Sequence, residues 1–193
     1  MIEIIKDAVI KKLEHDSMRL NHTLGVYETA IKLAKHYKLD VEKVAIASLF
    51  HDYAKNDSIE DTKAILDPKI IEKYKAFPVM YHALSAAKQL EEKFYITDKD
   101  ILDPIRSHIW GRVKMSMYEK VVFVADYAEP NRKFFDPYEI YELALKDIDL
   151  AVLKCMTLTL RYLEKQDIKP NLEQIEAYHY YMEVNSGKTK QDY

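Results

Sequence analysis

Apolar residues recur every three or four positions through most of this 193-residue chain. Two clear stripes are formed by Val26, Ala30, Leu33 and Tyr37, and by Val79, Ala83, Ala86 and Leu90. This spacing gathers apolar side chains on one face of an α-helix. We expect about eight to ten helices of ordinary length and essentially no sheet. The chain has only 3 glycines, whereas a sheet protein needs many turns, so the fold class is predicted to be all-α.

Capping residues mark where several helices begin. Asp67 and Asp136 each precede a proline, which pairs an N-capping carboxylate with a proline at the first helical position. Three further pairs resemble capping boxes: Ser116 with Glu119, Thr97 with Asp100, and Asn171 with Gln174. The segment Val121–Val124 has strand propensity, but the capping box before it and the alanines after it favour a buried helix.

The chain shows no linker rich in proline, glycine or serine and no internal repeat. We therefore expect one helical domain over residues 1–184 and a frayed polar tail over residues 185–193. The formal charge of −3 argues against binding nucleic acid or an acidic membrane through bulk charge. The N-terminal residues alternate charged and apolar positions, unlike a signal peptide or a membrane span.

Cys155 is the only cysteine and cannot form an intrachain disulfide. Its apolar helical surroundings predict a buried, inert thiol. A chain that needs no disulfide suits a reducing compartment, so we predict a cytoplasmic protein.

The dipeptide His51-Asp52 closes the apolar run Val44–Phe50. A charged carboxylate beside an imidazole in such surroundings requires a compensating partner, which a metal ion can supply. Other residues of ligand type lie on apolar helical faces or in apolar segments: His22, His82, His108 and Asp126. Each histidine alone is more simply a satisfied core residue, but one inward-facing site explains the whole set.

Four imidazoles and two carboxylates are too many for one tetrahedral zinc ion. They suit two adjacent cations that share a bridging carboxylate and keep open positions for water and a phosphate oxygen. Such ligands favour iron, manganese or zinc over magnesium, and the spacing does not choose among them. The remaining histidines have surface or packing roles: His15, His36 and His179.

With these residues in place, the chain resembles the HD-domain metal-dependent phosphohydrolases, and among them most closely the YqeK-type bacterial enzymes that hydrolyse diadenosine tetraphosphate symmetrically. The resemblance runs from Arg19 to Arg132 and is carried by five ordered blocks: RLNHTLGV (19–26), LFHDYAK (49–55), YHALSA (81–86), IRSHIWGR (105–112) and EKVVFVADYAEPNR (119–132). The last block is the most specific of them.

The resemblance implies an HD-domain helical bundle with a binuclear metal centre, usually iron, bridged by Asp52. His22, His51 and Asp126 would complete one metal, and His82 and His108 the other. The resemblance also implies two catalytic residues, Asp52 and Lys55. The substrate-binding residues that it implies are Arg19, Lys55, Gly111 and Arg132. The implied reaction is attack of a metal-activated hydroxide on phosphorus, which releases two ADP molecules.

The spacing along the chain independently supports a place near the metals for two of these basic side chains. Lys55 follows His51 by one turn, so it can lean over the same pocket. Arg132 follows Pro130, which stops the preceding helix and can turn the guanidinium back towards the metals. Glu129 is left open, either orienting a cation or bound water or lying at the surface.

Some positions depart from the family pattern. Ile109 and Trp110 stand where the family shows a threonine pair, Ser85 replaces a glycine, and Pro104 implies a kinked helix or a helix start at Asp103. Trp110 either offers a stacking face for a base or packs in the core.

Several alternatives stay open. The enzyme could hydrolyse another nucleotide, either a nucleoside monophosphate or an alarmone, act as a di-iron oxygenase, or be a non-catalytic nucleotide-binding sensor. The EPNR block and Lys55 favour phosphate chemistry, and the complete ligand set speaks against a sensor. The tyrosines at Tyr178, Tyr180 and Tyr181 would either form a homodimer surface or seal the last helix to the core.

Overall fold

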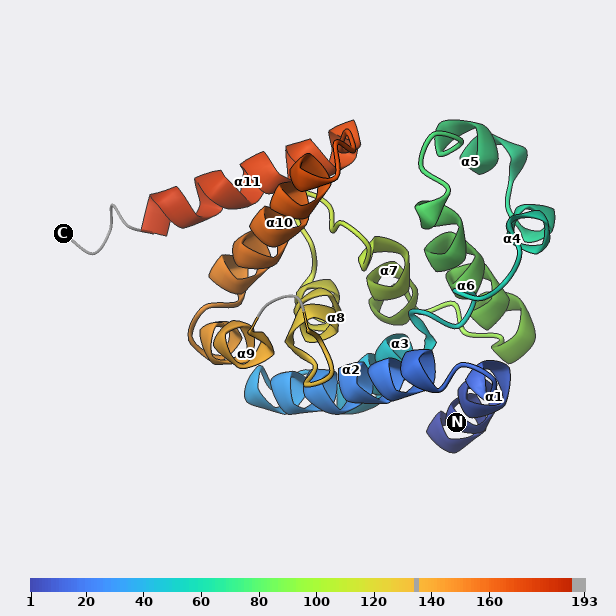
Figure 1. The fold of residues 1–193 in the computed structure, drawn as a ribbon. Helices are drawn as coiled ribbons and strands as arrows, with labels where there is room; N and C mark the ends of the chain where they lie inside the picture. Colours follow the sequence, from blue (N-terminus) through green and yellow to red (C-terminus); the bar gives the residue numbers. More distant parts are fainter. Residues whose placement is uncertain (134–135, 189–193) are drawn as a thin grey trace.

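The computed structural model describes residues 1–133 and 136–188, which form eleven α-helices and no strand (Figure 1). The helices are α1 (Ile2–Leu13), α2 (Ser17–His36), α3 (Val41–Phe50), α4 (Ile59–Ile65), α5 (Pro68–Lys73), α6 (Val79–Phe94), α7 (Lys99–Ser107), α8 (Met117–Ala128), α9 (Pro137–Lys146), α10 (Ile148–Lys165) and α11 (Leu172–Lys188). The predicted all-α class is confirmed. The helices outnumber the expectation because α4 and α5 are short, with 7 and 6 residues.

Helix α3 lies at the centre of the fold. Its residues from Val44 to Phe50 are all buried, because α1, α2, α7 and α8 pack around it. Helices α9 and α10 pack against α8 on one side, where α11 packs on α10, and α4, α5 and α6 form the other side (Figure 1). This arrangement brings α2, α3, α6, α7 and α8 together around the predicted ligands.

Local capping explains where the helices begin. The side chains of Asp67 and Asp136 cap α5 and α9, each followed by its proline, as predicted. Ser116 and Glu119 form the predicted capping box of α8, and Val121–Val124 is the expected buried helix.

The expected start of the helix that leads to His108 is wrong. Asp98, rather than Thr97, caps α7, and its side chain accepts a hydrogen bond from the backbone N–H of Asp100 at 2.9 Å. Because this cap starts the helix upstream, Pro104 lies inside α7 and the helix does not begin at Asp103.

The predicted tail begins too early. Helix α11 continues to Lys188, because Asn185 Nδ2 donates to the carbonyl oxygens of Tyr181 at 2.7 Å and Asp149 at 3.2 Å. The rest of the predicted tail, residues 189–193, lies outside the described residues.

The C-terminal tyrosines hold α11 to the core. Tyr181 is buried, and its hydroxyl accepts a hydrogen bond from the backbone N–H of Met115 at 3.2 Å. Tyr178 and Tyr180 also pack against the core, which favours the sealing role over a dimer surface. Trp110 packs with Tyr74 and Met80 in a smaller apolar cluster, which favours its packing role. None of the helices within the described residues is long and apolar enough to cross a membrane.

Cys155 is buried in α10, and burial raises the pKa of its thiol. A thiol with a raised pKa forms little of the reactive thiolate. The buried, inert thiol expected from the sequence is confirmed.

Candidate metal centre

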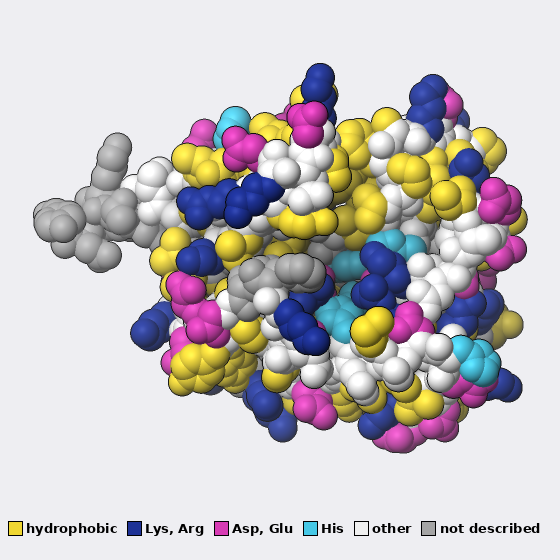
Figure 2. All heavy atoms as spheres, in the orientation of Figure 1, with side chains coloured by type: hydrophobic (Ala, Val, Ile, Leu, Met, Phe, Trp, Pro, Cys, Tyr) yellow, Lys and Arg dark blue, Asp and Glu magenta, His cyan; other side chains and the backbone are white. Residues whose placement is uncertain are grey.

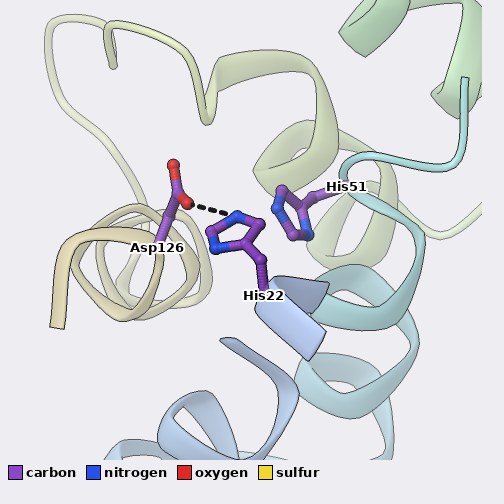
Figure 3. Close-up of side chains that lie close together, drawn as sticks. All are labelled: His22, His51 and Asp126. Atoms are coloured by element: carbon purple, nitrogen blue, oxygen red, sulfur yellow. Dashed lines mark ion pairs between the residues drawn. The ribbon is translucent and has the colours of Figure 1, made fainter. Parts of the chain in front are cut away.

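The six predicted ligands come from five helices and meet in the interior. His22 lies in α2, His82 in α6 and Asp126 in α8. His51 is the C-cap of α3 and is followed by Asp52, and His108 is the C-cap of α7. All six are buried. Their ligand atoms form two groups, each with its atoms within 4.8 Å of one another. The first group is His22, His51 and Asp126 (Figure 3), and the second group is Asp52, His82 and His108.

Asp52 directs one carboxylate oxygen towards each group of histidines. Its Oδ1 lies 3.2 Å from Nε2 of His82 and 3.6 Å from Nε2 of His108. Its Oδ2 lies 3.6 Å from Nε2 of His51 and 3.7 Å from Nε2 of His22. A carboxylate between two ligand groups has the position of a bridging ligand. The grouping matches the division that the resemblance implies.

Backbone carbonyls orient two of the histidines. Nδ1 of His51 donates to the carbonyl oxygen of Ser48 at 2.6 Å, and Nδ1 of His108 donates to that of Ile105 at 2.8 Å. Both histidines cap helix C-termini, where the last carbonyls lack partners within the helix. A carbonyl oxygen only accepts, so the proton is on Nδ1 and Nε2 is left with a lone pair directed into the site.

Unpartnered polar atoms show that the site suits a cation. Nε2 of His22, Nε2 of His51 and Oδ1 of Asp52 are buried and have no hydrogen-bond partner among the described residues. Nε2 of His22 also faces Oδ1 of Asp126 at a distance of 3.0 Å (Figure 3). Two acceptors at this distance require a cation between or beside them, either a proton on the imidazole or a metal ion.

The protonation states of two histidines and of both aspartates also favour metal binding. Burial lowers the pKa of His51 to about 3 and that of His82 to about 4, so both imidazoles are neutral near pH 7. Burial would raise the pKa of Asp52, but His51 and His108 hold it well below its ordinary value. Burial would also raise the pKa of Asp126, but the nearby charge of Arg132 helps to hold it below its ordinary value. Neutral imidazoles and ionised carboxylates are the forms that bind metals.

Three of the predicted substrate-binding residues lie at this site. Nη1 of Arg19 lies 2.6 Å from Oδ2 of Asp52, and Nζ of Lys55 lies 3.4 Å from Nε2 of His82. Arg132 donates through Nε to the carbonyl oxygen of Asp126 at 2.8 Å and pairs through Nη2 with its carboxylate. Figure 2 shows histidine side chains in a hollow near the middle of this face, with Lys and Arg side chains beside them.

Gly111 has a different environment. It lies between α7 and α8 with a φ of 71°, a conformation that favours glycine. A Cβ at this position would lie 2.6 Å from Cε of Met156. Backbone conformation and packing therefore account for this glycine, and its role in substrate binding stays a prediction.

Glu129 is a site residue that sequence reasoning did not assign. It is buried, not at the surface, and its Oε1 accepts a hydrogen bond from Nδ1 of His22 at 3.0 Å. The backbone carbonyls that orient the other histidines were also missed. Their signal was the position of His51 and His108 at the ends of helices, three residues after the accepting carbonyls.

The comparisons with known proteins agree with this architecture. Residues 19–131 match the HD domain, and the chain therefore belongs to the HD-domain family. Within the family it is similar to two proteins named symmetrical bis(5'-nucleosyl)-tetraphosphatase. The Halalkalibacterium halodurans protein is 37% identical and the Bacillus subtilis protein 40% identical, and each alignment covers 77% of this chain and 81% of the relative.

A solved structure supports the same assignment. It is the crystal structure of a predicted HD superfamily hydrolase involved in NAD metabolism from Clostridium acetobutylicum. The two structures superpose with a TM-score of 0.84 at 30% identity, over 95% of this chain and 98% of the other. The chain is thus an HD-superfamily hydrolase, as the sequence predicts.

Proposed function

We propose that this chain is a binuclear metal-dependent hydrolase that cleaves diadenosine tetraphosphate symmetrically into two ADP molecules. The observation that carries the proposal is the position of Asp52, with one oxygen directed to each group of histidines. The names of the two bacterial relatives support the substrate.

The first group would hold one metal ion and the second group the other, with Asp52 shared between them. Iron is the expected metal, and manganese and zinc are alternatives with the same ligand preferences. Bound ions would supply Lewis-acid activation of water and of a substrate phosphate oxygen.

Basic side chains of this chain supply positive charge for the phosphates of the substrate. Arg19, Lys55 and Arg132 surround the two groups, so they can offset charge on the phosphate oxygens during the reaction. Arg132 is also fixed by its two hydrogen bonds to Asp126, which leaves its orientation set before substrate binds. Asp52, as a bridging ligand, would position the ions and not serve as a free general base.

Hydrolysis of another nucleotide is the second candidate. The Clostridium relative is described as acting in NAD metabolism, which suggests nucleotide substrates other than diadenosine tetraphosphate. A nucleoside monophosphate and an alarmone are the compounds to compare. The homodimer and the cytoplasmic location remain predictions.

A nucleotide hydrolysis screen with chromatographic identification of products tests the proposal. The protein is purified with its native metal and assayed for iron. ADP as the sole product from diadenosine tetraphosphate would support it, whereas ATP with AMP would contradict symmetrical cleavage. A metal-loaded protein that leaves this substrate intact but hydrolyses a monophosphate or an alarmone would support the second candidate.

A further inference from the structure

Glu129 is a buried carboxylate that the proposed reaction does not use. It caps the C-terminus of α8 and is 1% exposed. While Oε1 accepts from His22, Oε2 accepts from the backbone N–H of Asn131 at 2.7 Å and from its Nδ2 at 2.9 Å. Nδ2 of Asn131 also donates to the carbonyl oxygen of Asn21 at 3.3 Å. The carboxylate is therefore held in place from both sides, by α2 and by the segment after α8.

Gly25 makes room for this carboxylate. It lies in the interior of α2, three residues after His22, where glycine is unfavourable relative to alanine. A Cβ at Gly25 would lie 2.5 Å from Oε2 of Glu129 and 3.1 Å from Nδ2 of Asn131. The close approach of Glu129 thus gives a physical reason for a glycine inside the helix.

His22 differs from the other histidines in its acceptor. Nδ1 of His51 and Nδ1 of His108 donate to neutral backbone carbonyls, whereas Nδ1 of His22 donates to a carboxylate. A carboxylate acceptor fixes the tautomer and also makes the opposite nitrogen a stronger electron donor. This support reaches the first group alone, because among the described contacts Glu129 touches no residue of the second group.

We propose that Glu129 is a positioning residue that fixes His22 Nε2 towards the first group and strengthens metal binding there. Asn131 holds Glu129, and Gly25 gives it space. This inference rests on the metal-binding part of the proposed function. It predicts that the two metal positions respond differently to changes at Glu129.

Zinc titration against a chelating dye tests the inference without relying on activity. Glu129→Ala and Glu129→Gln should weaken Zn²⁺ binding at one of two positions by about 10- to 100-fold and leave the other unchanged. Glutamine keeps the volume, but its NH₂ must face either His22 Nδ1–H or the N–H groups of Asn131. The glutamine variant therefore loses hydrogen bonds without leaving a cavity. It keeps the inference testable if the alanine variant fails to fold.

Glu119→Gln is the matched control. Glu119 is equally buried, at 1% exposure, and accepts hydrogen bonds from the backbone N–H of Ser116 and from Arg112. It is not a neighbour of any candidate ligand in these contacts. The control should lower the melting temperature while both Zn²⁺ affinities stay unchanged.

A double-mutant cycle tests the role of Gly25. Gly25→Ala should weaken the same Zn²⁺ position, because its Cβ displaces the carboxylate. In the Glu129→Ala background it should add little, since the group that it displaces is gone.

The outcomes separate this inference from the proposed function. If the wild-type protein binds fewer than two Zn²⁺ ions, the binuclear site and this inference both fail. If it binds two and the Glu129 and Gly25 variants bind both as tightly, only the inference fails. Equal weakening of both positions would also overturn it, because Glu129 would then act on the fold as a whole.

Discussion

The guanidinium of Arg19 lies 2.6 Å from Oδ2 of Asp52, the carboxylate between the two ligand groups. The Asp52 side chain is 3% exposed, whereas that of Arg19 is 28% exposed and reaches the surface. A metal ion bound to Oδ2 would compete with this guanidinium. Metal binding and the availability of Arg19 for a phosphate are therefore linked through one oxygen atom.

Arg19→Ala should destabilise the metal-free protein more than the metal-loaded protein. Without the guanidinium, Asp52 loses a charged hydrogen bond, which costs about 1.5–3 kcal/mol in free energy of unfolding. Bound ions would neutralise the same carboxylate and reduce this loss. Urea denaturation with EDTA and with Zn²⁺ measures the difference, and equal losses in the two conditions would contradict the expected competition.

Asp52→Ala should abolish hydrolysis of diadenosine tetraphosphate and reduce the bound metal. It removes the oxygens that connect the first group to the second. The measurements are kcat and metal content per chain. Asp57→Ala is the control, because Asp57 pairs with Lys12 and is not one of the candidate ligands. Full activity in the Asp52 variant would exclude the binuclear mechanism.

Lys55→Met and Arg132→Met should have different effects. Lys55 contacts a ligand imidazole but holds no carboxylate, so its loss should lower kcat by about 10²- to 10³-fold with the metal retained. Arg132 orients Asp126, so its loss should lower both activity and metal content. Parallel assays of kcat and bound metal distinguish the two. Metal loss in the Lys55 variant, or unchanged metal in the Arg132 variant, would contradict these roles.

The metal-free protein should lose stability as the pH falls from about 6.5 to about 4. The pKa values of His51 and His82, lowered by burial to about 3 and about 4, mean that the unfolded chain binds more protons across this range. Each such histidine makes the free energy of unfolding fall by up to about 1.4 kcal/mol per pH unit, because the unfolded chain binds about one more proton there than the folded protein does. Burial lowers the pKa of His22, but the pairing with Asp126 outweighs it and the pKa is raised above the ordinary value. The stability that His22 contributes is therefore lost only above about pH 6.5, and it stays nearly constant across the range from 6.5 to 4.

Urea midpoints of the EDTA-treated protein across this pH range measure the effect. His82→Gln should reduce the slope, because it removes one of the two neutral histidines. Stability that stays constant or rises as the pH falls would contradict the neutral, buried state of these side chains.

Local sequence patterns were sufficient for much of the helical structure. The caps at Asp67, Ser116 and Asp136 act within a few residues of the chain, so the sequence reveals them directly. The errors came where two local signals competed or where a distant contact decided. Asp98 rather than Thr97 caps α7, and Asn185 stays helical because its side chain reaches Asp149 in α10.

The sequence by itself determined the all-α class and the six buried residues of ligand type, because periodicity and apolar neighbours are local properties. The resemblance also implied how these residues divide into two groups, whereas only the tertiary structure decided where each oxygen of Asp52 lies. The tertiary structure also decided that Glu129 contacts His22 across 107 positions of sequence. Such relationships depend on how α2, α3, α6, α7 and α8 pack, and packing geometry is not encoded in the spacing along any one helix.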